Sequence, residues 1–491
     1  MEAGPASSAG PAPSRLVAID VARCLALLGM VATHVLDPRT LDGELTLAQS
    51  LAGGRASALF AVLAGLSIAL TTGRRVPLRG RVRAAASTGL VVRAGLVAGV
   101  GLVLGELDAG IAIILVYYGV LFVCALPFLG LGARTLLGWA AGWLVVAPVL
   151  AHLLRAELPA RGWESPSFAS LADPGPLLSE LLVTGYYPVL PWVAYLLAGM
   201  ALGRMDLGSR RVAAAVAVTG GLLAGAAVAV SDALTRRADV VAALVADWPS
   251  WLAPPVPGAD LLDQPAGGMF GTTPTGAWEW LLVRAPHSAT PFDLAHTVGS
   301  AWLVIGVALL VVGLLPAVAR YAVAVVFGAG TATLTFYALH VAMNSALLPP
   351  AETPESFRWH VLVLAAGGAG LVALGRRGPL ETGVGALARG TASVVAAWPG
   401  GRVGYGAAMD ANDDKTPTDD SQDRSPEQSE GQVSEVASME GGGAGEEIDP
   451  GDATAGSPDH SAGDDRPDEG TAGPDAPPRH GIPEDSNESS R

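Results

Sequence analysis

Apolar segments of about 20 residues recur along most of this chain. A helix rises 1.5 Å per residue, so a run of that length crosses the ~30 Å hydrocarbon core of a bilayer. We predict ten such segments, at residues 16–36, 53–71, 87–105, 109–128, 134–154, 183–203, 212–231, 297–316, 321–348 and 358–375. Lipid offers no hydrogen-bond partners, so the backbone N–H and C=O groups must bond to each other. A helix satisfies all of them within one segment. The sequence therefore predicts an all-α fold, a polytopic integral membrane helical bundle of about ten transmembrane helices.

Charge is distributed very unevenly along the chain. Hydrophobic residues make up 51% and charged residues only 15%, which excludes an ordinary soluble protein. The net charge of -15 comes from residues 409–491, which hold 23 acidic and 5 basic residues amid Gly, Pro and Ser. Such a segment cannot bury enough apolar surface to fold, so we expect a disordered acidic tail. Because the acidity belongs to the tail, it does not indicate a cationic substrate. We expect no nucleic-acid partner.

The remaining sequence divides into a short N-terminal segment and one membrane domain. Residues 1–14 are expected to be disordered, and residues 15–400 to form the transmembrane domain. Its longest connection, residues 232–296, is rich in Pro, Gly and Trp, and we interpret it as an outer loop or cap without a core of its own. Aromatic residues there and at 186–192 fit either a belt at the membrane interface or a platform for a sugar ring.

Arginines in the short loops predict the orientation of the bundle. The loops after the second, sixth and tenth segments share this enrichment, through Arg74, Arg75, Arg79, Arg81, Arg83, Arg204, Arg210, Arg211, Arg376 and Arg377. Positive residues favour the cytoplasmic side, so we expect a multi-pass protein of the cell membrane with both termini in the cytoplasm. A cleavable signal peptide is not expected, because Asp20 and Arg23 interrupt the start of the apolar stretch.

The first apolar segment contains three ionisable residues, Asp20, Arg23 and His34. Asp20 and Arg23 are three residues apart, which predicts an ion pair on one helix face. Ten residues separate Arg23 from His34, so the two share a face about 16 Å apart along the helix. Ionisable groups at membrane depth usually serve function, although Arg23 in a snorkelling position and His34 at an interfacial helix end are structural alternatives.

These residues resemble a known family. The run from Asp20 through Arg23 to Gly29 and Met30 is similar to the first-span signature of bacterial relatives of heparan-alpha-glucosaminide N-acetyltransferase, and Arg23 and His34 have the spacing of acyltransferase family 3. Cys24 stands where the signature has glycine, and His34 is a candidate by position. Further similar blocks follow in order: SALFAVLAGLSIAL (57–70), IAIILVYYGVLFVCALPFL (111–129), YYPVLPWVAYLLAGMALGR (186–204), PHSATPFDL (286–294), GAGTATLTFYALH (328–340) and GPLE (378–381).

The resemblance implies an acyltransferase of the transmembrane acyltransferase superfamily. It would move an acetyl or similar group from cytoplasmic acyl-CoA, with acetyl-CoA as the donor substrate, to an extracytoplasmic glycan or other acceptor. His34, or alternatively His287 or His340 on the same side, would act as the catalytic base or transient acyl carrier. Asp20, Arg23 and Arg93 would bind the donor. No spacing of histidines or carboxylates indicates a metal site.

Two other functions fit the same residues. The buried Asp, Arg and His would form a substrate or proton path in a transporter or channel, although paired inverted halves are not evident. A membrane scaffold whose acidic tail recruits partners is the second alternative. The lipid bilayer is the expected environment in every case, and the sequence is compatible with a homo-oligomer.

The arginine distribution generates a prediction of topology. Reporter fusions at Gly80, in the basic loop, and at Gly267, in the long outer loop, are expected to report opposite compartments, with Gly80 cytoplasmic. If both fusions report the same compartment, the ten-segment arrangement is wrong.

Overall fold

The computed structural model describes residues 14–159, 162, 164–255, 260–348 and 356–397. Within these residues the chain is helical, and the β pairing found there is an isolated bridge between Arg39 and Leu45. The predicted all-α fold is therefore confirmed. The acidic tail at 409–491 and the first thirteen residues lie outside the described part of the chain.

Fifteen α-helices are defined in the described residues. They are α1 (Ser14–Val35), α2 (Leu47–Ala52), α3 (Arg55–Thr71), α4 (Gly80–Gly105), α5 (Leu115–Cys124), α6 (Ala133–Arg155), α7 (Pro174–Ser179), α8 (Val189–Gly203), α9 (Arg210–Thr235), α10 (Ala238–Ala246), α11 (Pro291–Leu314), α12 (Ala317–Val326), α13 (Thr333–Asn344), α14 (Ser356–Ala373) and α15 (Pro379–Ala397). Short 3-10 or π segments are η1 (Leu126–Phe128), η2 (Ala169–Ala172), η3 (Glu180–Thr184), η4 (Pro265–Gly267), η5 (Trp278–Leu282) and η6 (Gly328–Thr331).

Seven helical segments of the described chain are long and apolar enough to cross a membrane, and a bent pair brings the number to eight. The bent pair joins Pro174–Thr184 to Val189–Gly203 at 52°. Three of the ten predicted segments are not single long helices, and the one at 183–203 falls in this bent pair. The segment at 109–128 becomes helical only at Leu115, and the one at 321–348 divides into α12, η6 and α13. Gly328 and Gly330 lie at the interruption between α12 and α13. Glycine disfavours a continuous helix, which helps to explain the break.

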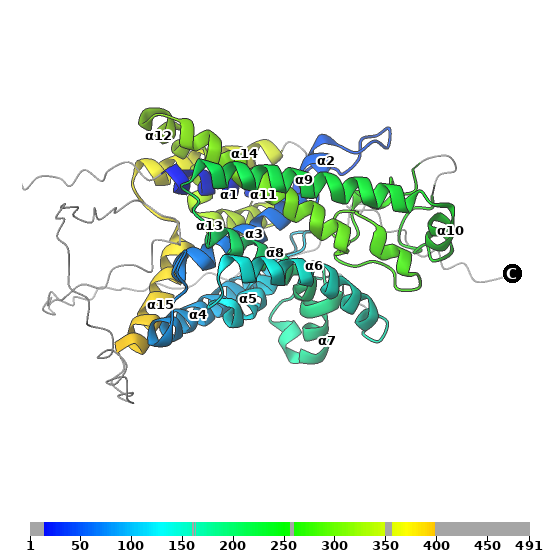
Figure 1. Ribbon diagram of the computed structural model, residues 1–491, viewed down its shortest axis with the longest axis horizontal. Helices are drawn as coiled ribbons and strands as arrows, with labels where there is room; N and C mark the ends of the chain where they lie inside the picture. Colours follow the sequence, from blue (N-terminus) through cyan, green and yellow to red (C-terminus); the bar gives the residue numbers. More distant parts are fainter. Residues whose placement is uncertain (1–13, 160–161, 163, 256–259, 349–355, 398–491) are drawn as a thin grey trace, which may run out of the picture. The chain divides into compact units, whose positions relative to one another are not determined.

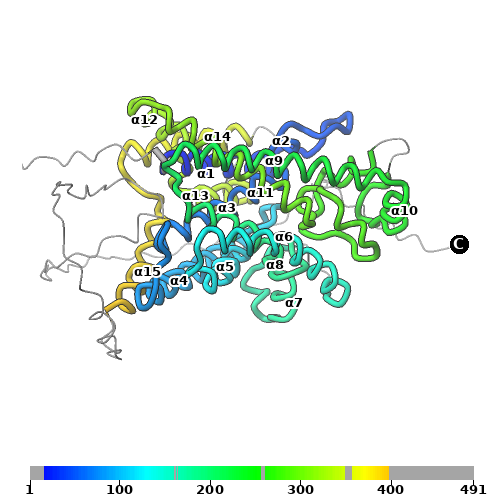
Figure 2. Tube along the Cα trace, viewed as in Figure 1, coloured from blue at the N-terminus to red at the C-terminus, as the bar shows by residue number. Residues whose placement is uncertain are grey.

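Helix α1 lies among several other helices of the bundle (Figures 1 and 2). It contacts α3, α11 and η6, while α9 runs beside α11, α8 beside α3, and α15 beside α4. One large apolar cluster extends through these helices. A polar side chain on α1 is therefore surrounded by protein rather than left facing lipid.

Glycines allow α3 and α8 to approach closely. A Cβ atom added at Gly199 would lie 1.8 Å from the Val62 carbonyl oxygen, and one at Gly65 would lie 2.1 Å from that of Leu196. Small residues at such crossings let backbones pack directly, which is how membrane helices gain packing energy where lipid is as apolar as the side chains.

The connection at 232–296 is more structured than a loop. Helix α9 continues to Thr235, α10 follows, and a separate apolar cluster forms around the fully buried Trp280. The Trp280 indole donates a hydrogen bond to Asp247 over 3.1 Å, and Arg284 is paired with Asp232 at 2.6 Å. Trp280 therefore belongs to a small core, which the sequence interpretation did not anticipate.

Arg204, one of the arginines that predict the orientation of the bundle, has a structural role. Its guanidinium is buried and donates to the carbonyl oxygens of Ala69, Thr72 and Leu129 at the ends of α3 and η1. Burial lowers the pKa of Arg204 to about 10, so it remains charged at neutral pH. Arg204 therefore caps the carbonyl ends of these helices. Its presence in a loop rich in arginine has a structural reason as well as a topological one.

The α3–α8 crossing generates a prediction of stability. Gly199→Ala is expected to lower the thermal transition of the purified protein, because its Cβ would collide with backbone at Val62. Gly95→Ala is the matched control: that position is also helical but has open space around it, so the better helix propensity of alanine should keep or raise the transition. Equal transitions for the two variants would contradict the close crossing.

Candidate functional site

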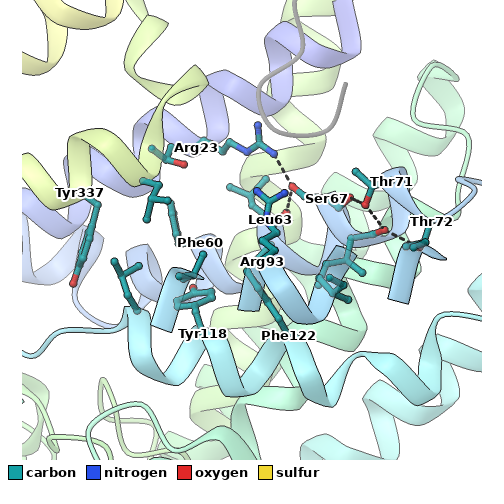
Figure 3. Close-up of a pocket in the computed structure, with 18 residues that line it drawn as sticks. Arg23, Phe60, Leu63, Ser67, Thr71, Thr72, Arg93, Tyr118, Phe122 and Tyr337 are labelled. Atoms are coloured by element: carbon teal, nitrogen blue, oxygen red, sulfur yellow. Dashed lines mark hydrogen bonds between the residues drawn. The ribbon is translucent and has the colours of Figure 1, made fainter. Parts of the chain in front are cut away.

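A pocket lies among α1, α3, α4, α5 and α13 (Figure 3). Its empty space, open surroundings included, amounts to about 880 Å³. Most of its lining is apolar, including Phe60, Leu63 and Phe122, and two arginines, Arg23 and Arg93, enter it. An apolar pocket with a few placed polar groups is the usual form of a small-molecule site.

Arg23 is held by two partners at the wall of this pocket. Its Nη1 donates to Asp20 Oδ1 over 3.1 Å, and its Nη2 donates to Ser67 Oγ over 2.6 Å. The Ser67 hydroxyl in turn donates to the Leu63 carbonyl oxygen over 2.7 Å. The Arg23 side chain is only 7% exposed, so snorkelling to the interface does not describe it. The predicted Asp20–Arg23 ion pair is confirmed.

Further polar groups of the pocket come from other helices. Arg93 lies on α4, and the hydroxyls of Thr71 and Thr72 stand at the end of α3. The Tyr118 hydroxyl is buried and has no hydrogen-bond partner among the described residues. A buried hydroxyl without a partner is unfavourable, so this atom is suited to a bound polar ligand.

The break before α13 gives the pocket one of its walls. A Cβ atom at Gly330 would lie 1.8 Å from the Asp20 carbonyl oxygen, so η6 packs directly on the turn of α1 that carries the ion pair. Glu381 is buried and accepts hydrogen bonds from the Leu334 and Thr335 backbone N–H groups at 2.6 and 3.0 Å. A carboxylate suits this helix start because the first N–H groups lack helical partners.

His34 and His340 form a hydrogen-bonded pair. The His34 Nδ1 and His340 Nε2 atoms are 3.0 Å apart, and the rings are stacked with centroids 5.2 Å apart. Tyr337, one helical turn before His340, lines the Arg23 pocket. The pocket follows α3 from Thr72 to Phe60 and α13 from Thr333 to Tyr337, so it ends one turn from the histidine pair.

His360 was not identified from the sequence. It lies on α14, packs edge to face on His340 with ring centroids 4.8 Å apart, and contacts the Ser356 carbonyl oxygen through Nδ1 at 2.9 Å. In the sequence it looks like one histidine near the start of an apolar segment. Only the packing of α14 beside α13 brings it to the site, so no local signal pointed to it.

His287 lies in a different environment from the other candidate histidines. Its ring contacts Tyr186 and Tyr187, with centroids 4.9 and 5.7 Å away, and its backbone has a positive φ of 57°. That conformation is unusual for a residue other than glycine. The structure joins His34 to His340, whereas the His287 ring packs on Tyr186 and Tyr187.

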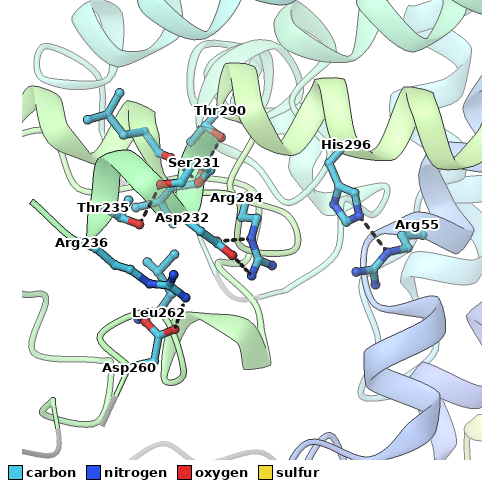
Figure 4. Close-up of polar contacts among 12 residues, drawn as sticks. Arg55, Ser231, Asp232, Thr235, Arg236, Asp260, Leu262, Arg284, Thr290 and His296 are labelled. Atoms are coloured by element: carbon cyan, nitrogen blue, oxygen red, sulfur yellow. Dashed lines mark hydrogen bonds and ion pairs between the residues drawn. The ribbon is translucent and has the colours of Figure 1, made fainter. Parts of the chain in front are cut away.

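A second polar cluster lies near the starts of α3 and α11 (Figure 4). Arg55 donates through Nε to His296 Nε2 over 3.3 Å, and Arg284 pairs with Asp232 on the neighbouring segment. The Nε2 atom of His296 therefore accepts a hydrogen bond from Arg55. Within the described residues no group of three or more His, Cys, Asp or Glu side chains is arranged to hold a metal ion.

Comparison with known proteins identifies the N-terminal part of the chain. Residues 15–230 match the family model described as heparan-alpha-glucosaminide N-acetyltransferase, catalytic. This part of the chain is similar to that family. No curated protein and no solved structure matches the sequence.

The family match confirms the resemblance drawn from the sequence and indicates a transmembrane acetyltransferase. Asp20, Arg23, His34 and Arg93 lie inside the matched residues, whereas His340 lies beyond them. Several helices that complete the site therefore follow the matched segment, and their contribution rests on the structure.

Proposed function

We propose that this protein is a membrane acyltransferase that moves an acetyl or similar acyl group from cytoplasmic acyl-CoA to an extracytoplasmic glycan or other acceptor. The observation that carries the proposal is the pocket that holds Arg23 and Arg93 and ends one helical turn from the His34–His340 pair. In this proposal the donor occupies the pocket, and the acceptor approaches the histidine pair.

The donor end of the pocket suits a phosphorylated thioester. Guanidinium groups bind phosphate through paired hydrogen bonds, and two of them enter this pocket from α1 and α4. Asp20 and Ser67 fix the plane of the Arg23 guanidinium. The unpartnered Tyr118 hydroxyl offers a donor to a carbonyl or amide of the bound molecule. The apolar lining favours the long, mostly uncharged arm of such a donor.

His34 is the proposed base at the acceptor end. A neutral imidazole accepts the proton of an acceptor hydroxyl or amine while the acceptor oxygen or nitrogen attacks the thioester carbon. The carbon–sulfur bond then breaks, and the thiolate leaves and takes up a proton. A transient acyl group on the imidazole is the alternative route, with the same bonds broken and formed in two steps. In this proposal the basic loop and both termini face the cytoplasm.

The donor site generates a prediction for binding. Arg23→Lys is expected to weaken binding of acetyl-CoA at least about tenfold, because one ammonium cannot reach both Asp20 and Ser67 and also present a fork to phosphate. Binding to purified protein is measured by calorimetry. Arg210→Lys, at an exposed start of α9, is the control and should bind normally. Unchanged binding in Arg23→Lys would exclude the donor role of Arg23.

The acceptor site generates a prediction for catalysis. His34→Ala is expected to lower acceptor acetylation about 10² to 10⁴-fold while acetyl-CoA binding stays within about twofold, since a base acts in the transfer step. His287→Ala and His340→Ala are compared in the same assay, with expression measured for each. Normal turnover in His34→Ala together with an inactive His287→Ala would transfer the role to His287. Uptake of acceptor without acetylation would favour the transporter alternative.

A further inference from the structure

Two tyrosines, Tyr118 on α5 and Tyr337 on α13, line the apolar pocket (Figure 3). We propose that their hydroxyl groups bind the carbonyl oxygen of the acyl thioester and stabilise the negative charge that this oxygen gains during transfer. The inference rests on the proposed acyl transfer. It adds two catalytic residues and specifies which end of the pocket holds the reacting carbon.

The Tyr118 hydroxyl is buried without a hydrogen-bond partner in the described part of the chain. The residue is 2% exposed, and its ring is held edge to face by Phe60 and Phe122, with centroids 5.7 and 5.9 Å away. A phenol is protonated at neutral pH, so this hydroxyl has a hydrogen to donate. Because a buried hydroxyl without a partner is unfavourable, its position in a pocket wall indicates that a ligand supplies the acceptor.

The Tyr337 hydroxyl is fixed by the backbone. It accepts a hydrogen bond from the Ile114 N–H group over 3.2 Å, and the residue is 1% exposed. This contact uses a lone pair of the oxygen and leaves the hydroxyl hydrogen unused. Among the residues placed by the structure, none accepts that hydrogen. Tyr337 therefore offers a second donor to the pocket.

The two hydroxyls come from neighbouring turns. Tyr337 reaches Ile114, the residue before α5, and Tyr118 lies one turn later with its N–H group bonded to the Ile114 carbonyl oxygen over 3.1 Å. Helical side chains lean toward the preceding turn, so Tyr118 leans toward Ile114 and the Tyr337 hydroxyl. The two hydroxyls do not bond each other. A ligand oxygen placed between them would accept a hydrogen bond from both.

The transfer reaction supplies an oxygen that needs two donors. When the acceptor attacks the acyl carbon, the π electrons of the C=O bond move to the carbonyl oxygen, and the acceptor proton passes to the base. The oxyanion then re-forms the C=O bond while the carbon–sulfur bond breaks, and the thiolate leaves and takes up a proton. Both tyrosines keep their hydrogens throughout. Fixed donors in an apolar pocket are effective because they need not reorganise as the charge develops.

The position of Tyr337 also orients the donor in the pocket. Tyr337 lies one helical turn before His340, which contacts His34. A thioester carbonyl bound by the tyrosines is therefore at the end of the pocket next to the histidine pair. The guanidinium groups of Arg23 and Arg93 remain for the phosphates of the same molecule.

Tyr118→Phe removes the hydroxyl and keeps the ring. We expect kcat to fall at least about tenfold while the KM for acetyl-CoA stays within about twofold, because the contact strengthens in the transition state. The thermal transition should not fall, since the hydroxyl that is lost has no internal partner. Unchanged kcat would overturn the proposal.

Tyr117→Phe is the matched control. Tyr117 is the adjacent residue on α5, and its hydroxyl donates to Glu180 over 3.0 Å. This variant should keep kcat within about threefold but have a lower thermal transition, because an internal hydrogen bond is lost. A transition lowered as far in Tyr118→Phe as in Tyr117→Phe would contradict the proposal, since it would reveal an internal partner for the Tyr118 hydroxyl.

Isotope-edited infrared spectroscopy tests the contact without turnover. The probe is acetyl-CoA isotopically labelled at its carbonyl carbon and bound to purified protein in the absence of acceptor. Hydrogen bonds to a carbonyl oxygen lower its stretching frequency, so the frequency should be lower in the original protein and in Tyr117→Phe than in Tyr118→Phe or Tyr337→Phe. If acetyl-CoA binds with the same frequency in all four proteins, the inference fails and the donor site stands. If acetyl-CoA does not bind to the original protein, the proposed function fails with it.

Discussion

A guanidinium held inside an apolar helical bundle is the constraint on which the site depends. A charge at this depth is costly unless it is paired and hydrogen-bonded, and Arg23 meets the requirement with Asp20 on its own helix and Ser67 on α3. Because both nitrogens of its fork are engaged, α1 and α3 must keep a fixed rotation relative to each other. That rotation directs Arg23 to the pocket. It also sets the face of α1 on which His34 lies, eleven residues farther along.

Buried charges in this protein serve two distinct purposes. Arg204 and Glu381 satisfy backbone groups at helix ends, which lipid cannot do. Arg23 instead pairs with the side chains of Asp20 and Ser67, and it lines a pocket. Charge in an apolar segment is therefore a poor guide to function by itself. The chemical identity of the partners separates a charge that caps a helix end from one that lies in the wall of a pocket.

The interruption of the helix before α13 connects structure to function. Gly330 lets η6 rest on the Asp20 backbone, and Glu381 supplies the acceptors that the start of α13 needs. Helix α13 can thus begin within the bundle, where Thr333 and Tyr337 line the pocket. One turn later the same helix carries His340 to His34. A continuous helix through this region would not place glycine backbone against α1 and a capped helix start beside the pocket.

The sequence by itself determined the all-helical membrane fold and the Asp20–Arg23 pair, because hydropathy over 20 residues and a spacing of three residues are local properties. It also carried the family match of residues 15–230. It did not determine that residues 321–348 divide into shorter helices, since the carboxylate that allows the break, Glu381, is remote in the chain. Only the tertiary structure decided which histidines meet. His34 and His340 are 306 residues apart, and His360 joins them from a third helix, so their contact depends on how α1, α13 and α14 pack rather than on any pattern along one helix.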